Sequence, residues 1–158
     1  NLPVSSPDSS IPLLLSDSGR VNVPSTRRNT IIAIPGFSPG DSVHQIQNRL
    51  GNPTQSTTIN DYLTNVYEIV PNRVRLGYVY SQSNEVVQSE AAFLGGVDRL
   101  VMRTTLLGML DGRSTKEIEQ GLESVRTGAQ DRFEFESRGF VGSISRNTYS
   151  HIHIVVRQ

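Results

Sequence analysis

The 158-residue sequence has no cysteine, which excludes disulfides, thiolate metal sites and cysteine nucleophiles. An excess charge of either sign is also absent, because 15 Lys plus Arg balance 15 Asp plus Glu. The molecule as a whole is therefore not attracted to nucleic acid or to an anionic membrane. Apolar runs stay far short of the ~20 residues that cross a bilayer. We expect no nucleic-acid partner and no membrane span within this chain.

Lysine is almost missing, since Lys116 is the only one and every other basic residue is arginine. Arginine binds carboxylates and phosphates through a planar fork of N–H donors. Ordinary surface salt bridges are the favoured interpretation of this bias. An arginine-lined anion site is the alternative.

Sequence patterns of catalysis are missing as well. Residues 35–40 read Pro-Gly-Phe-Ser-Pro-Gly but lack the Gly-Lys-Ser/Thr ending of a phosphate-binding loop. His151 and His153 would place two imidazoles on one face of a strand, yet no carboxylate stands at a supporting spacing. An exposed strand face is favoured over a metal pair. We expect no catalytic residue, no cofactor, no metal and therefore no enzyme activity in this chain.

A phrase that occurs twice is the most informative feature present. Residues 40–50 read Gly-x-Ser-x-x-Gln-Ile-x-x-x-Leu, and residues 112–122 repeat this as Gly-x-Ser-x-x-Glu-Ile-x-x-x-Leu. A serine followed three residues later by Gln or Glu is typical of a capping box at a helix start. The phrase predicts two helices capped by Ser42 and Ser114.

β-prone sequence follows each of these helices. Alternating apolar and polar residues predict a three-strand meander after the first helix, at residues 62–70, 73–80 and 85–93. In its second strand Arg73 and Arg75 share the polar face. The second half is predicted to hold helices at residues 98–110 and from residue 114, and then strands at about residues 132–136, 140–146 and 149–157.

These elements predict an α+β fold in which helices pack on one face of an antiparallel sheet. Each half alone is small for a stable domain. We therefore expect one globular domain over residues 31–158, made of two tandem helix–meander repeats at about residues 31–94 and 97–157.

Residues 1–30 are rich in proline and serine, and such a composition buries too little apolar surface to order itself. They are predicted to form a linker, with Leu13, Leu14 and Leu15 docked on the domain. A start at Asn1 without Met is typical of a piece cut from a longer protein.

Several short segments carry a resemblance to a known family. Residues 70–80, Val-Pro-Asn-Arg-Val-Arg-Leu-Gly-Tyr-Val-Tyr, resemble a stretch in the C-terminal regions of cyanobacterial serine/threonine protein kinases. Other segments that are similar to this family lie at residues 35–40, 50–53, 86–93, 139–147 and 152–156. The sequence departs from the family at Ser89 and Ala91, where Thr and Val are usual.

The resemblance implies a non-catalytic regulatory or sensor domain, because the lysine, catalytic-loop and Asp-Phe-Gly motifs of a kinase domain are absent. It implies an attached kinase domain in cis and a protein, peptide or small ligand as partner. Two candidate binding surfaces follow: the solvent-facing side of the strand with Arg73 and Arg75, and the loop from Phe37 to Asp41.

A more distant resemblance leads to an alternative function. A helix that ends in Leu-Gly-x-Pro before a meander is similar to the α+β fold of outer-membrane lipoproteins and β-lactamase inhibitors, of which tandem copies are known. It implies a stand-alone envelope binding protein. The compartment depends on what precedes Asn1, because an intervening membrane span would place the domain outside the cytoplasm.

Overall fold

A computed structural model describes residues 11, 13–15 and 34–158, and it has an α+β fold. The predictions for the other residues of 1–30, and for residues 31–33, concern residues outside this described part. In chain order the elements are α1 Val43–Leu50, β1 Gln55–Ile59, β2 Tyr62–Val70, β3 Val74–Tyr80, β4 Val86–Phe93, α2 Arg99–Met109, α3 Lys116–Arg126, β5 Arg132–Ser137, β6 Phe140–Arg146 and β7 Ile152–Arg157.

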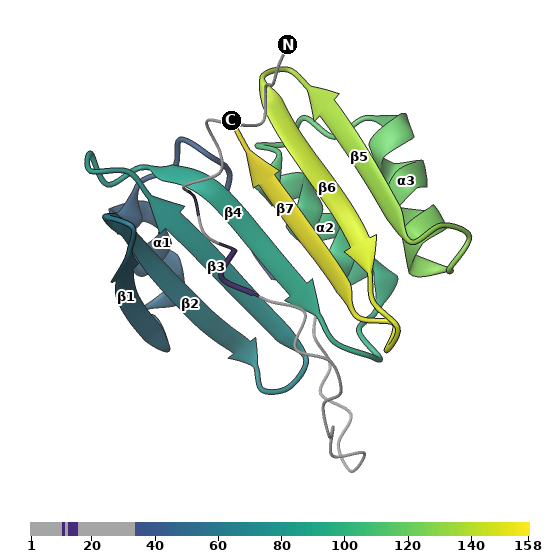
Figure 1. Ribbon diagram of the computed structural model, residues 1–158, viewed down its shortest axis with the longest axis horizontal. Helices are drawn as coiled ribbons and strands as arrows, with labels where there is room; N and C mark the ends of the chain where they lie inside the picture. Colours follow the sequence, from purple (N-terminus) through teal and green to yellow (C-terminus); the bar gives the residue numbers. More distant parts are fainter. Residues whose placement is uncertain (1–10, 12, 16–33) are drawn as a thin grey trace.

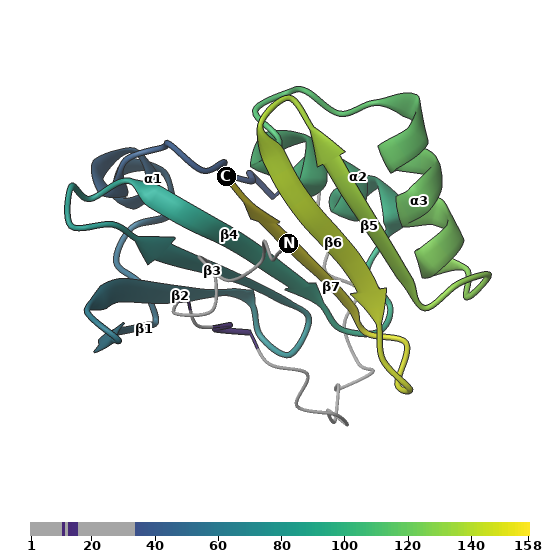
Figure 2. The ribbon, with the colours of Figure 1, turned by 45° about the horizontal axis from the view of Figure 1, so that its top comes forward.

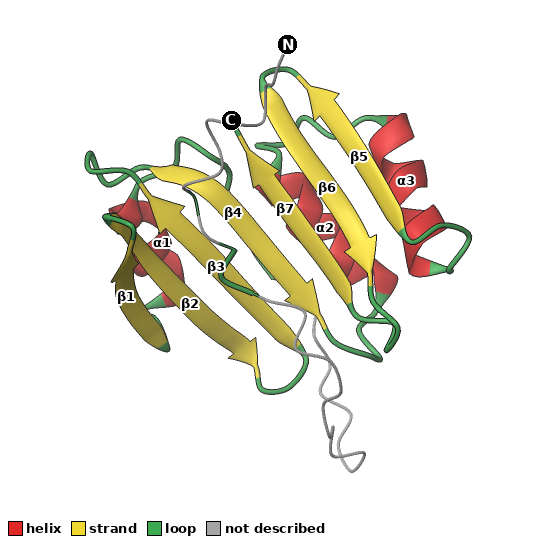
Figure 3. Cartoon of the chain, in the orientation of Figure 1, coloured by secondary structure: helices red, strands yellow, loops and turns green. Residues whose placement is uncertain are grey.

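One antiparallel sheet holds all seven of these strands, in the order β1-β2-β3-β4-β7-β6-β5 (Figures 1 and 3). Each meander keeps its strands in sequence order, so the two halves of the chain meet where β4 pairs with β7. In that pairing Glu90 is opposite Val155 and Ala92 is opposite His153. The centre of the sheet is thus formed by the last strand of each half.

The helices lie on one face of the sheet, as predicted, and the core fills the space between the two layers (Figure 2). Alternation along β3 places Val74, Leu76, Tyr78 and Tyr80 in this core, and Arg75 on the other face. The other side of the sheet is called the open face below. None of the helices in the described part is long and apolar enough to cross a membrane.

Helix capping follows the predicted pattern in the first copy of the repeated phrase and departs from it in the second. Ser42 Oγ accepts from the Gln45 N–H at 3.1 Å, and Gln45 Oε1 accepts from the Ser42 N–H at 2.9 Å. In α3, however, Thr115 is the N-cap and its Oγ1 accepts from the Ile118 N–H at 3.2 Å. The prediction of Ser114 as the cap is wrong, because the neighbouring threonine offers the same hydroxyl one residue later.

Within residues 34–94 the structure has four strands after α1, one more than the predicted three-strand meander. The additional strand, β1, has every residue exposed, so it carries no apolar alternation that could reveal it. Its turn to β2 consists of Asn60 and Asp61 at φ 51° and 68°. Positive φ at both central residues is typical of the two-residue turns that join antiparallel strands. The duplication of the two halves stays a prediction, because the first half adds β1 and the second half adds α2.

Two glycines allow α2 to touch the segment that leads into α1. A Cβ atom on Gly108 would lie 2.5 Å from the Gly36 carbonyl oxygen, and one on Gly36 would lie 2.0 Å from the Thr105 carbonyl oxygen. Thr105 Oγ1 also donates to the Ile34 carbonyl oxygen at 2.9 Å. This backbone-to-backbone crossing joins the two halves on the helical face.

Candidate functional site

The open face carries a buried carboxylate at its centre. Glu90 lies in the middle of β4, and its side chain is 0% exposed. Burying a carboxylate is costly unless hydrogen bonds replace the water that it loses. The groups that supply these hydrogen bonds define the candidate site.

Two of the donors come from the N-terminal segment. The N–H of Leu14 donates to Glu90 Oε2 at 2.9 Å, and the N–H of Leu15 donates to Oε1 at 3.1 Å. Leu15 is 4% exposed, whereas Leu13 is 60% exposed. Leu14 and Leu15 are called the strap below. Figure 1 shows this segment, in purple, across the open face and opposite the helices.

A glycine in β3 provides the room for the strap. Gly77 is the register partner of Glu90, and both lie on the open face. A Cβ atom at Gly77 would lie 3.2 Å from Leu15 Cγ and 3.3 Å from Leu14 Cβ. Glycine weakens a strand interior and often marks a close approach by another segment. The sheet is therefore shaped for the strap at this position.

The remaining donors come from the sheet itself. Gln88 Nε2 donates to Glu90 Oε2 at 2.9 Å, and His153 Nε2 lies 3.0 Å from Oε1. Gln88, Glu90 and His153 are called the carboxylate site below. With the strap in place, each oxygen of Glu90 has two partners.

A carboxylate in contact with an imidazole can orient that ring for proton transfer, provided that a nucleophile lies within hydrogen-bond reach. Ser145 is the register partner of His153 on β6. No hydrogen bond joins its hydroxyl to His153 among the described residues. The chemistry that the geometry supports is therefore the binding of N–H donors by Glu90.

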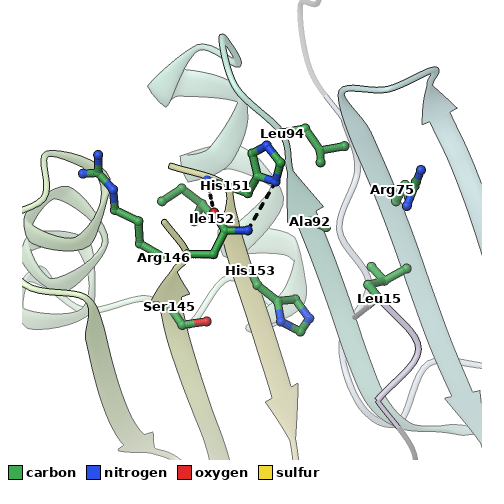
Figure 4. A pocket seen from close by; sticks show the side chains of 10 residues that line it. Leu15, Arg75, Ala92, Leu94, Ser145, Arg146, His151, Ile152 and His153 are labelled. Carbon is green, nitrogen blue, oxygen red and sulfur yellow. Dashed lines mark hydrogen bonds between the residues drawn. The ribbon is translucent and has the colours of Figure 1, made fainter. Parts of the chain in front are cut away.

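A hollow of about 150 Å³ lies beside the strap. Figure 4 shows Ile152 and His153 on β7 and His151 just before it, with Leu15 and Arg75 on the far side of β4. The residues that line the hollow come from β3, β4, β6, β7, the neighbouring loops and the strap: Leu15, Arg75, Ala92, Leu94, Ser145, Arg146, Asn147, His151, Ile152 and His153. It is therefore partly apolar, with imidazole and amide groups at one side.

A second hollow of about 270 Å³ lies on the other side of the strap. Its lining includes Leu14, Leu15, Glu68 and Arg75. Arg75 Nε is 3.9 Å from Glu68 Oε2, so this arginine is partly neutralised. The strap thus separates two hollows and contributes leucine side chains to both.

The residues of the two candidate binding surfaces lie in different parts of the molecule. Phe37 packs edge-on against Tyr78, with ring centroids 6.0 Å apart, and therefore lies on the helical side of the sheet. Asp41 Oδ2 accepts from the Ser38 N–H at 2.9 Å beside α1. Arg73 donates from Nη1 to the Gly95 carbonyl oxygen at 3.2 Å and holds two loops together. Only Arg75 of these four contributes to the hollows.

The two histidines of the His-x-His motif have different contacts. His151 precedes β7, and its backbone N–H donates to Asn147 Oδ1 at 2.9 Å. His153 lies within β7 and contacts Glu90. Within the described residues, no group of three His, Asp or Glu side chains is placed to hold a metal ion.

The aromatic cluster under the helices is also polar. Tyr67 donates to the Gly51 carbonyl oxygen at 3.0 Å, but the hydroxyl of Tyr78 is buried with no hydrogen-bond partner in the part of the chain described. Burial raises the pKa of Tyr67, Tyr78 and Tyr80 above the ordinary tyrosine value. The neighbouring Tyr80, Tyr67 and Asp41 raise the pKa of Tyr78 further, because their negative charge would oppose ionisation.

Sequence reasoning missed Glu90 and Gln88, although a signal was present. Both residues fall on the same face of a strand that also contains Ala91 and Phe93, so a glutamate is placed inside a buried strand. Such a glutamate needs partners. The sequence does not name them, because the strap lies 75 and 76 residues earlier and His153 lies 63 residues later.

Comparison with known proteins gives no relative for this site. No protein-family model, no curated protein and no solved structure matches the chain significantly.

Proposed function

We propose that this chain is a non-catalytic regulatory domain from the C-terminal end of a serine/threonine protein kinase, and that it acts by binding a partner on its open face. The observation that supports this proposal is the strap. Leu14 and Leu15 belong to the stretch predicted as a linker, and both donate to the buried carboxylate of Glu90. In this proposal, the position of Leu14 and Leu15 is coupled to the occupancy of the open face.

A partner that binds the open face only after the strap has left shifts the population toward the released state. The released linker then changes the position of the attached kinase domain or its dimerisation. Regulation of this kind needs no reacting group in the domain, and Glu90 acts only as an acceptor.

The test is autophosphorylation of the full-length gene product. We expect its rate to change when residues 31–158 are removed, and to change in the same direction in the E90Q variant. Equal rates for all three proteins under every condition tried would contradict the proposal. The residues that precede Asn1 separate the alternatives, because a kinase domain supports this function and a lipoprotein signal supports the stand-alone envelope binding protein.

A further inference from the structure

We propose that the carboxylate site is a docking site for a leucine-containing peptide, occupied in this chain by its own strap and able to take the same peptide from another molecule. The proposal deepens the binding function proposed above, and it rests on that function only for the premise that the open face binds a partner. It does not require a kinase. The ligand class is an apolar peptide segment that presents two successive backbone N–H groups.

The main chain of the peptide supplies the first half of the recognition. Leu14 and Leu15 donate from adjacent backbone nitrogens to the two oxygens of one carboxylate, at 2.9 and 3.1 Å. Once the strap leaves, Gln88 still contacts Oε2 of Glu90 and His153 still contacts Oε1. Each oxygen then has one free acceptor site, which needs a new donor. Capture of main-chain groups is an established mode of peptide recognition, and it excludes proline at these two positions.

Side chains supply the selectivity. Leu15 is 4% exposed and lies against Gly77, and its side chain lines both hollows. The hollow that Leu15 lines also includes Ala92 and Leu94, which suit an aliphatic side chain better than a charged one. Leu13 is 60% exposed and adds little. The second of the two donating residues therefore determines which peptides fit.

The strap competes because it belongs to the same chain. A tethered ligand acts at an effective concentration of roughly millimolar. A peptide from another molecule therefore binds weakly while the strap is docked and more tightly after the strap is displaced. This competition makes the site a switch that a leucine-containing partner can operate.

The experiment uses the full 158-residue chain and a fluorescent peptide of residues 9–17, Ser-Ser-Ile-Pro-Leu-Leu-Leu-Ser-Asp. The L14D/L15D variant releases the strap, because two carboxylates cannot approach Glu90. Fluorescence anisotropy is expected to show at least about tenfold tighter binding to this variant than to the wild type. Replacing the peptide leucine that corresponds to Leu15 with N-methylleucine, which keeps the side chain and removes the N–H, is expected to weaken binding about tenfold.

A second substitution places the peptide on the carboxylate. E90Q added to L14D/L15D is expected to weaken peptide binding about tenfold, because the charge is lost. E134Q is the matched control, since Glu134 lies in the same row of the open face, on the edge strand β5, and is exposed. Equal peptide affinity for wild type and L14D/L15D, or affinity unaffected by E90Q, would overturn the proposal.

If circular dichroism shows that L14D/L15D does not fold, the wild type provides the test. Addition of unlabelled peptide is then expected to speed hydrogen exchange at the Leu14 and Leu15 amides and to leave the Val155 amide unchanged. Unchanged exchange at all three amides, with peptide in large excess, would overturn the proposal. Kinase regulation can fail in the autophosphorylation test while peptide docking holds, so the two proposals fail separately.

Discussion

Glu90 brings together segments of the chain that are far apart in sequence. Besides its neighbour Gln88, its partners lie 75 or 76 residues before it in the strap and 63 residues after it in β7. A buried charge contributes little net stability by itself, but removing one partner of a buried pair is costly. The main effect of Glu90 is therefore to select the segments that come into contact. Its contribution to the stability of the sheet is small.

The first prediction concerns this residue alone. The E90Q variant keeps the shape of the side chain but removes the charge that holds two N–H groups of the strap. Hydrogen bonds to charged groups contribute about 1.5–3 kcal/mol, so exchange of the Leu14 and Leu15 amides should accelerate at least about tenfold. Hydrogen exchange followed by NMR measures this directly. Protection of these two amides that equals the wild type would show that Glu90 does not hold the strap.

At the scale of single elements, the serine of the repeated phrase has a different role in each copy. In α1 the serine of the phrase is the N-cap, but in α3 the cap has moved to Thr115. Ser114 Oγ is buried and has no hydrogen-bond partner within the described residues. A shared sequence pattern therefore positions the helix to within one residue without assigning the capping side chain.

A pair of substitutions tests this assignment. T115A should lower the free energy of unfolding by about 1 kcal/mol, the usual cost of losing an N-cap. S114A should leave it unchanged or raise it slightly, because no hydrogen bond is lost and a buried polar atom is removed. Urea denaturation of the two variants measures the difference. The opposite order of stability would restore Ser114 as the cap.

The crossing of α2 over the Ile34–Gly36 segment depends on the absence of side chains. Alanine at position 108 improves helix propensity by about 1 kcal/mol in an exposed helix. At this contact, however, its Cβ would lie 2.5 Å from the Gly36 carbonyl oxygen, so the helix must move.

We expect G108A to destabilise the protein by about 1–3 kcal/mol, the range for overpacking, despite the better propensity. G95A is the control, since nothing lies within 4 Å of a Cβ atom placed there. Urea denaturation again provides the measurement. Stabilisation of the protein by G108A would show that the crossing is looser than described.

At the scale of the whole molecule, the buried tyrosines make stability depend on pH in the alkaline range. Burial raises the pKa of Tyr67, Tyr78 and Tyr80 in the folded protein, whereas the unfolded chain ionises near pH 10. The full stability is present below about pH 10, and it falls as pH rises further, because only the unfolded chain then loses protons.

The slope should reach about 1.4 kcal/mol per pH unit for each tyrosine that stays protonated. The Y78F variant should reduce that slope by the contribution of one tyrosine. At neutral pH it should lower the free energy of unfolding only slightly, because the hydroxyl has no hydrogen-bond partner among the described residues. Unfolding free energies from pH 8 to 11 in urea measure both effects. A slope that Y78F leaves unchanged would contradict this account.

Much of the fold follows from local patterns in the sequence. Alternation along β3 identified the buried face, and the apolar positions Ile118, Leu122 and Val125 identified the inner side of α3, where all three are buried. Polar β1 was missed because its residues are exposed on both faces and leave no periodic signal. Such alternation arises only when one face of a strand is buried, so an edge strand with both faces exposed does not show it.

The candidate site could not be predicted in the same way. Arg75 was correctly placed on the polar face of its strand, but Phe37 and Asp41 belong to the helical side. What makes the site is the meeting of β4, β7 and the strap around Glu90, and long-range pairing of this kind has no local signature. The family resemblance and the regulatory function that it implies stay predictions.

The strap and the final strand are both attached to one side chain in the middle of the sequence. A force applied to the chain N-terminal to Leu14 is therefore transmitted to the central pair β4–β7, and not to an edge of the sheet. Central strands are anchored on both sides, so the two hydrogen bonds of the strap should break well before the sheet is disturbed. A pulling force should therefore free Leu14 and Leu15 from Glu90 while the sheet stays intact.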